Sequence, residues 1–162
     1  MTIETPAILS LEDRGVPFRI FEHSGEVHSL EQAAAERGQT PDQVVRSLLF
    51  RNETGEFVLV LAAGLRQVNW KTLRKYLGVR RVTMASADEV FNVTGSPIGA
   101  VSPFGHPVSL RVIIDARIFQ LDEISTGSGT RGVGLILQSA DLLTALPYAE
   151  SAALTSDDET HD

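Results

Sequence analysis

Cysteine is absent from this sequence of 162 residues. That absence excludes a disulfide framework, thiol catalysis and a zinc site built on thiolates. No apolar run approaches the roughly 20 residues that a membrane-spanning helix needs. The first ten residues also lack the basic start and apolar run of a signal peptide. We therefore expect a cytoplasmic protein without a membrane partner.

Patterns for metal binding and for a serine nucleophile are also missing. None of the four histidines shows a ligand spacing such as i, i+4 on a helix. No serine lies in a G-x-S-x-G strand-to-helix elbow. We expect no metal and no cofactor, and we interpret His23 and His28 either as pocket-lining or as structural side chains.

The acidic charge is unevenly distributed. The formal net charge of −7 argues at first against a nucleic-acid partner, yet five acids and no base lie in residues 150–162. This small, polar segment is typical of a disordered tail. We therefore assign residues 1–149 to one folded domain and residues 150–162 to an acidic tail.

Basic residues gather instead between Arg66 and Arg81, where no acid occurs. In the helix predicted over residues 69–77, Trp70, Leu73 and Leu77 share an apolar face. Three cations share another face of this helix: Lys71, Arg74 and Lys75. This basic face is either an ordinary solvated surface or a contact for a phosphate backbone.

Helix-start signals alternate with β-branched runs along the chain. Thr5-Pro6, Ser29 and Ser86 each precede a predicted short helix, and Ser139 is predicted to cap a helix over residues 140–146. Strands are predicted at residues 18–21, 44–51, 57–63, 80–84, 110–115 and 133–138, with a hairpin around residues 52–55. The order favours a single α+β domain, with a mixed, mostly antiparallel sheet or a partly closed barrel flanked by short helices.

Two glycine-bearing loops stand before predicted strands, at residues 95–105 and 127–132. Glycine lets the main chain approach a ligand and present its N–H groups. The second loop spells G-x-G-x-x-G, but Gly132 leads into a strand rather than into the helix that a dinucleotide site requires. We interpret both loops as parts of a small-molecule or acyl-transfer site.

Arg46 is a charged residue within the apolar run of residues 44–50. A charge in such a strand is costly unless it is paired or faces water. Arg46 is therefore either exposed on a half-buried sheet or a fixed cation that looks into a pocket, where it could bind phosphate, carboxylate or ribose oxygens.

Four segments of the chain are informative together: residues 41–50, the basic strand Val79-Arg80-Arg81, the loop Gly99-Ala100-Val101-Ser102-Pro103-Phe104-Gly105 and the turn Ser128-Gly129-Thr130-Arg131-Gly132. Together they resemble the YbaK family, which is similar to the editing domain of bacterial prolyl-tRNA synthetase. The resemblance spans about residues 5 to 147 in one order and register. It implies a trans-acting hydrolase of mischarged aminoacyl-tRNA that uses neither a metal nor a covalent intermediate.

The resemblance also implies roles for particular residues. It assigns a contact with the tRNA terminus to Arg46, the lining of the aminoacyl pocket to Gly99–Ser102, and a hold on the substrate to Ser128. The candidate catalytic residues are thus Arg46, Gly99, Ala100 and Ser128. The candidate substrate-binding residues are Phe21, His28, Ser47, Val101, Ser102, Phe104 and Gly129. The cations Lys71, Arg74 and Lys75 would contact the acceptor end of the tRNA.

The sequence departs from the family pattern at three positions. Arg46 replaces a lysine, Phe21 stands where tyrosine is frequent, and Gly134 stands where aspartate is frequent. Two alternatives to a deacylase therefore stay open. One is a catalytically idle member that binds tRNA ends, a nucleotide or a tRNA synthetase, and the other is a protein acting on another small acylated molecule. We expect a monomer or a weak dimer.

Overall fold

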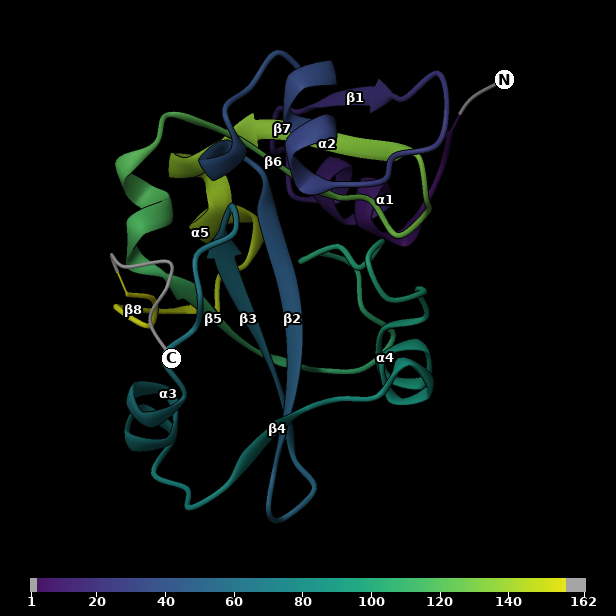
Figure 1. Ribbon diagram of the computed structural model, residues 1–162. Coiled ribbons are helices and arrows are strands. Elements are labelled where there is room, and N and C mark those ends of the chain that lie inside the picture. The colour runs from purple at the N-terminus through teal and green to yellow at the C-terminus, as the bar shows by residue number, and fades with distance from the viewer. Residues whose placement is uncertain (1–2, 157–162) are drawn as a thin grey trace.

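Two β-sheets form the framework of the computed structural model, which describes residues 3–156 (Figure 1). The larger sheet contains, in spatial order, β4 (Val82–Met84), β2 (Val45–Asn52), β3 (Phe57–Ala63), β5 (Arg111–Asp115) and β8 (Glu150–Ala152). The smaller sheet contains β1 (Arg19–Glu22), β7 (Val133–Gln138) and β6 (Glu123–Gly127). The smaller sheet is antiparallel, whereas the larger one is mixed, since β5 runs parallel to β3 and to β8. A parallel bridge between Val44 and Ser125 joins the two sheets.

Short helices flank these sheets. They are α1 (Pro6–Asp13), α2 (Leu30–Glu36), α3 (Trp70–Leu77), α4 (Ala87–Thr94) and α5 (Leu142–Ala145), with 3₁₀ turns at Pro41–Gln43, Ala116–Gln120 and Ser139–Asp141. Side-chain oxygens of Thr5, Ser29, Asn69 and Ser86 accept the free backbone N–H groups at the starts of the first four helices. In Figure 1, α1 and α2 lie beside the smaller sheet, while α3 lies at the opposite end of the molecule.

The centre of the larger sheet is buried on both faces. Alternate residues of β3 enter two apolar clusters: Leu59 and Leu61 belong to the cluster shared with the smaller sheet, and Val58 and Val60 to the cluster under α3. This explains why β3 is a nearly continuous apolar run rather than an alternating one. α3 contributes Leu73, which is fully buried.

The predicted fold class is confirmed. The chain is a single α+β domain with mixed sheets, and within residues 3–156 the strands form two open sheets rather than a closed barrel. The hairpin predicted around residues 52–55 joins β2 to β3. Gly132 precedes β7, so the G-x-G-x-x-G sequence lies between two strands and is not a dinucleotide fingerprint.

The expectation of a disordered tail beginning at residue 150 is wrong for residues 150–156. Glu150 begins β8, and its carboxylate accepts two hydrogen bonds from Arg111, at 2.7 and 2.9 Å. Leu154 is buried in the cluster under α3, and the buried Asp115 carboxylate accepts its backbone N–H. Tertiary pairing with β5 therefore orders a segment whose local composition is polar. The remaining acids of the predicted tail, Asp157, Asp158, Glu159 and Asp162, lie outside the described residues.

Candidate active site

Two glycines and a phenylalanine form a row across the smaller sheet. Gly134 in the middle strand β7 pairs with Phe21 of β1 on one side and with Gly127 of β6 on the other. Paired residues of antiparallel strands point to the same face. This face therefore has an aromatic ring at one edge and bare main chain beside it, and we call Phe21, Gly134 and Gly127 the glycine row.

The predicted loop of residues 95–105 packs on this row. A Cβ atom on Gly127 would lie 2.5 Å from the carbonyl oxygen of Val101 and 3.0 Å from that of Ala100. The N–H of Gly129 donates to Ala100 O at 2.8 Å. The structure thus brings together the two glycine loops that the sequence singled out, and their contact depends on the missing side chain at Gly127.

Two main-chain N–H groups of the first loop have no hydrogen-bond partner in the described part of the chain. Gly99 has φ = +88° and is exposed, a conformation that glycine adopts without strain. Within residues 3–156, the N–H groups of Gly99 and Val101 make no hydrogen bond, whereas that of Ala100 donates to Pro97 O. Free N–H groups beside a close main-chain contact are suited to bind a developing negative charge.

Several of the predicted side chains have internal partners. Ser128 is fully buried, and its Oγ lies 2.8 Å from Val133 O and 3.1 Å from Thr130 O, so it braces the turn of residues 128–133. Ser102 Oγ accepts the N–H of Phe104 at 3.2 Å, and the Phe104 ring is buried in the core. Their substrate contacts stay predictions, since in the structure these side chains stabilise the loops.

Arg46 is half-buried on β2. Its Nε and Nη2 donate to the backbone carbonyls of Gly64 and Arg66, which follow β3. Burial lowers the pKa of its guanidinium. Its Nη1 makes no hydrogen bond within the described part of the chain. Arg46 is thus neither simply exposed nor wholly directed into a pocket.

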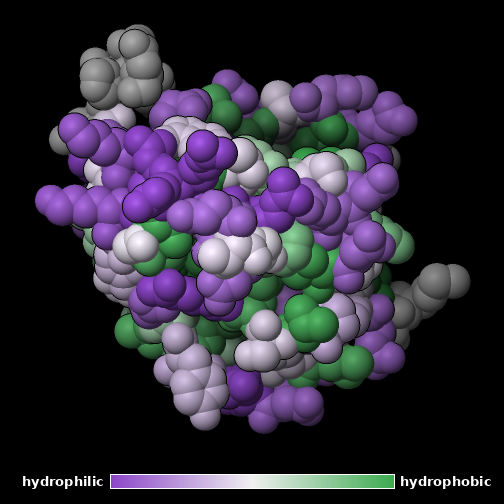
Figure 2. Space-filling model, turned by 90° about the horizontal axis from the view of Figure 1, so that it is seen from below, coloured by the Kyte–Doolittle hydropathy of each residue, from purple (hydrophilic) through white to green (hydrophobic). Residues whose placement is uncertain are grey.

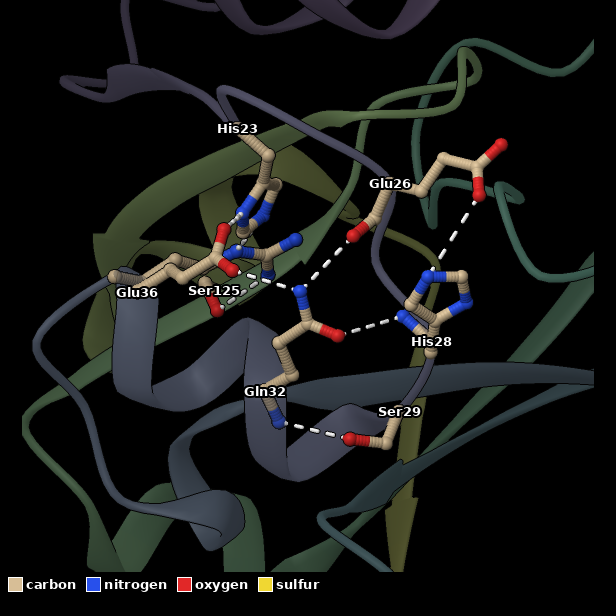
Figure 3. Close-up of polar contacts among 8 residues, drawn as sticks. His23, Glu26, His28, Ser29, Gln32, Glu36 and Ser125 are labelled. Carbon is tan, nitrogen blue, oxygen red and sulfur yellow. Dashed lines mark hydrogen bonds and ion pairs between the residues drawn. The ribbon is translucent and has the colours of Figure 1, made fainter.

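A polar network that the local sequence patterns do not predict covers the smaller sheet (Figure 3). The His23 side chain is 1% exposed, and its Nδ1 lies 2.7 Å from a carboxylate oxygen of Glu36 at the end of α2. Arg37, the next residue, donates from Nε to His23 Nε2 at 3.1 Å and from Nη1 to Ser125 Oγ at 2.9 Å. Gln32 of α2 donates to Glu26 O and accepts the N–H of His28, both in the preceding loop, and it also donates to Glu36 in the same helix. One signal of this network was in the sequence, because a glycine inside a strand such as Gly134 marks a close approach.

The other predicted binding residues are spread out. Phe21 is half-buried and makes an edge contact with the His23 ring at 4.9 Å. The His28 side chain is 73% exposed, and its Nε2 lies 3.6 Å from a carboxylate oxygen of Glu26. Figure 3 marks this contact with a dashed line. Ser47 Oγ is buried and has no hydrogen-bond partner in residues 3–156. Among the described residues, no group of three or more His, Asp and Glu side chains could hold a metal ion.

The basic face of α3 is exposed as its spacing predicts. Lys71 and Lys75 are exposed and Arg74 is half-buried, and none of the three forms an ion pair within residues 3–156. The view from below in Figure 2 shows hydrophilic residues over much of this end, with separate hydrophobic patches between them. No helix in the described residues is long and apolar enough to cross a membrane.

Comparisons with known proteins define the class. The model of the aminoacyl-tRNA editing domain matches residues 24–145, which is more than half of the chain. The chain therefore belongs to the aminoacyl-tRNA editing domain family, as the resemblance implied.

Particular relatives support this assignment. The multifunctional Ser/Thr-tRNA deacylase ProXp-y of Escherichia coli K12 is 30% identical to this chain over 140 residues. The match covers 84% of this chain and 83% of the deacylase. The proline--tRNA ligase of Kosmotoga olearia is 31% identical over 106 residues, covering 65% of this chain but only 18% of the ligase. The crystal structure of hypothetical protein APE2540 has the same fold, with a TM-score of 0.86 at 21% identity over 94% of this chain and all of that one.

Proposed function

We propose that this protein deacylates mischarged aminoacyl-tRNA in trans, and that the aminoacyl end binds on the glycine row. The observation that carries the proposal is the contact of the Ala100–Val101 main chain with Gly127, which brings the loop that contains the unpaired N–H groups of Gly99 and Val101 onto the glycine row. Seryl- and threonyl-tRNA are the first substrates to test, because the Escherichia coli relative is described as a Ser/Thr-tRNA deacylase.

The chemistry needs little from side chains. The ester between an amino acid and the terminal ribose is already reactive, so a water that is positioned by the protein or by the neighbouring ribose hydroxyl can attack its carbonyl. The attack places negative charge on the carbonyl oxygen, and the N–H groups of Gly99 and Val101 are available to stabilise it. The ester C–O bond then breaks, the ribose oxygen takes a proton, and the free amino acid leaves.

The cations have supporting roles in this proposal. The unpartnered Nη1 of Arg46 would contact the tRNA terminus, and the basic face of α3 would contact phosphates of the acceptor stem. Ser128 would act through the shape of the turn that it braces. A tRNA synthetase is a second proposed partner, since relatives include prolyl-tRNA ligases.

One observation favours the second candidate, a catalytically idle member that binds tRNA ends. Two of the predicted catalytic side chains, Arg46 and Ser128, contact the protein's own carbonyl groups. The two candidates differ in turnover and not in binding.

The test is a deacylation assay across tRNAs charged with different labelled amino acids, with catalytic amounts of protein, alongside a binding measurement. Deacylation of at least one charged tRNA well above the spontaneous rate supports the proposal. Binding of tRNA without acceleration of any ester would support the idle member instead. A protein that neither binds nor hydrolyses any of the charged tRNAs would contradict both candidates.

A further inference from the structure

Arg37 occupies the space that a side chain at position 134 would fill. A Cβ atom built on Gly134 would lie 2.5 Å from Cζ of Arg37, 2.6 Å from its Nη2 and 2.8 Å from its Nε. The guanidinium therefore lies directly on the main chain of the glycine row. The two residues are 97 positions apart in the sequence, and only the fold of α2 against β7 brings them together.

The guanidinium is held by groups that are themselves fixed. His23 Nε2 accepts from Arg37 Nε, so the proton of the neutral ring lies on Nδ1, where it donates to Glu36 at 2.7 Å. Ser125 is fully buried and donates its hydroxyl proton to Gln39 Oε1 at 2.7 Å, which leaves a lone pair for Arg37 Nη1. Both partners thus present acceptors to the guanidinium, which fixes its plane above the row.

One edge of this guanidinium has no partner. Nη2 makes no hydrogen bond with any residue from 3 to 156. Arg37 is half-buried, and burial lowers the pKa of its guanidinium while the Glu36 charge raises it. A partly desolvated cation with free N–H donors gains most from an oxygen acceptor on a bound ligand.

The positions of Arg37 and of the Ala100–Val101 main chain on the row indicate which ligand oxygen would lie near Nη2. Arg37 lies over Gly134, in the middle of the row, while the Ala100–Val101 main chain lies over Gly127 at one end. If the ester carbonyl binds at the Ala100–Val101 end, the side chain of the amino acid extends toward Arg37 and the Phe21 ring. A donor at this position contacts the amino acid rather than the ribose.

We propose that Arg37 determines specificity by donating a hydrogen bond from Nη2 to the side-chain oxygen of the aminoacyl group. The inference depends on the proposed deacylase function. It favours amino acids that carry a hydroxyl, such as threonine and serine, over apolar amino acids of the same shape. A bound valine would cover the guanidinium edge without supplying an acceptor, and leaving such a donor unpaired is penalised strongly.

The experiment compares one tRNA acylated with threonine and the same tRNA acylated with valine, since the two amino acids differ only by hydroxyl against methyl. For the wild-type protein we expect kcat/KM to be about tenfold or more higher for the threonyl ester than for the valyl ester. The ratio should be smaller than that of a fully enclosed polar site, because Arg37 is partly exposed. In Gly134→Ala the new Cβ displaces the guanidinium, and the threonine-to-valine ratio should fall to within about threefold of unity. Arg37→Met should lower the ratio in the same way.

Gly25→Ala is the matched control, because a Cβ there meets nothing within 4 Å. Its ratio should equal that of the wild type. Arg37→Met removes the partner of His23 and Ser125, so thermal unfolding checks that this variant still folds. If Arg37→Met does not fold, the ratio measured for Gly134→Ala decides the question. A wild-type ratio near unity, or an unchanged ratio in Gly134→Ala, would overturn the role of Arg37 while leaving deacylation itself established. If no charged tRNA is hydrolysed, the proposed function fails first, before any ratio is measured.

Discussion

Removing the Arg46 side chain should cost both stability and activity. The Arg46→Ala substitution deletes two charge-assisted hydrogen bonds, to the carbonyls of Gly64 and Arg66, and leaves these acceptors without a partner. Such bonds contribute about 1.5 to 3 kcal/mol each, and the lower part of that range applies because the site is half-exposed. We therefore expect the free energy of unfolding to fall by about 3 kcal/mol. For a domain of this size the melting temperature should then drop by about 6 to 12 °C.

The activity of Arg46→Ala follows a separate logic. If Nη1 holds the tRNA terminus, kcat/KM should fall about tenfold to a thousandfold, measured at a temperature where the variant is still folded. Arg46→Lys keeps the charge but lacks the fork that reaches two carbonyls, so it should recover part of the activity and little of the stability.

Arg51→Ala is the matched control, because Arg51 lies on the same strand and forms a more exposed ion pair with Glu89 at 2.6 Å. Its loss of stability should be smaller than that of Arg46→Ala. An Arg46→Ala protein as stable as the wild type would refute the bracing of residues 64–66. Full deacylation by the same variant would refute the contact with tRNA.

Three further predictions test other parts of the structure. Gly127→Ala should destabilise the fold by about 1 to 3 kcal/mol and slow deacylation, because its Cβ meets backbone that has little room to move; a melting temperature and a rate equal to those of Gly25→Ala would contradict this. Replacing all three cations of α3 by glutamine should weaken the binding of every tRNA and reduce the salt dependence of the binding constant by up to about three phosphate contacts; the cations are Lys71, Arg74 and Lys75. An unchanged salt dependence would show that this face is an ordinary solvated surface. Arg111 holds the pKa of Glu150 down to about 2 from 4.5, so Glu150 stabilises the fold above pH 4.5 and loses that contribution as the pH falls toward 2. In urea titrations, Glu150→Gln should be less stable than the wild type by about 1 kcal/mol or less at pH 7, with the gap closing toward pH 2; a gap that is independent of pH would show that Glu150 contributes in some other way.

Local signals predicted much of the fold. Capping residues such as Ser29 and Ser86 located helix starts, and the β-branched runs located β2, β3, β5 and β7 within one or two residues. Two strands were missed, β6 and β8. β6 contains the polar residues Glu123, Ser125 and Thr126, so its composition does not indicate a strand. It forms a strand because it pairs with β7 and buries Ile124 in the core. Ser139 donates to Leu121 O instead of capping a helix, and α5 begins only at Leu142.

The sequence singled out the two loops that meet in the candidate site, but it did not reveal the side-chain contacts beside them. Glycine spacing identified the loops at residues 95–105 and 127–132, and the structure brings them into contact. No local pattern could place Arg37 over Gly134 or tie Arg46 to Gly64, because these contacts join segments whose separation in the sequence hides their proximity. The burial of a hydroxyl such as that of Ser128 is a property of the whole fold, so no local pattern reveals it.

The most direct test of the account is the position of a bound aminoacyl end. A crystal structure with 3′-threonylamino-adenosine, in which an amide replaces the ester so that the ligand persists, would show where the amino acid binds. We predict that it lies on the glycine row, with its carbonyl toward the N–H groups of Gly99 and Val101 and its hydroxyl within hydrogen-bond distance of Arg37 Nη2. An aminoacyl group bound elsewhere, for example in the cleft of about 250 Å³ lined by Arg14, His106 and Tyr148, would contradict it.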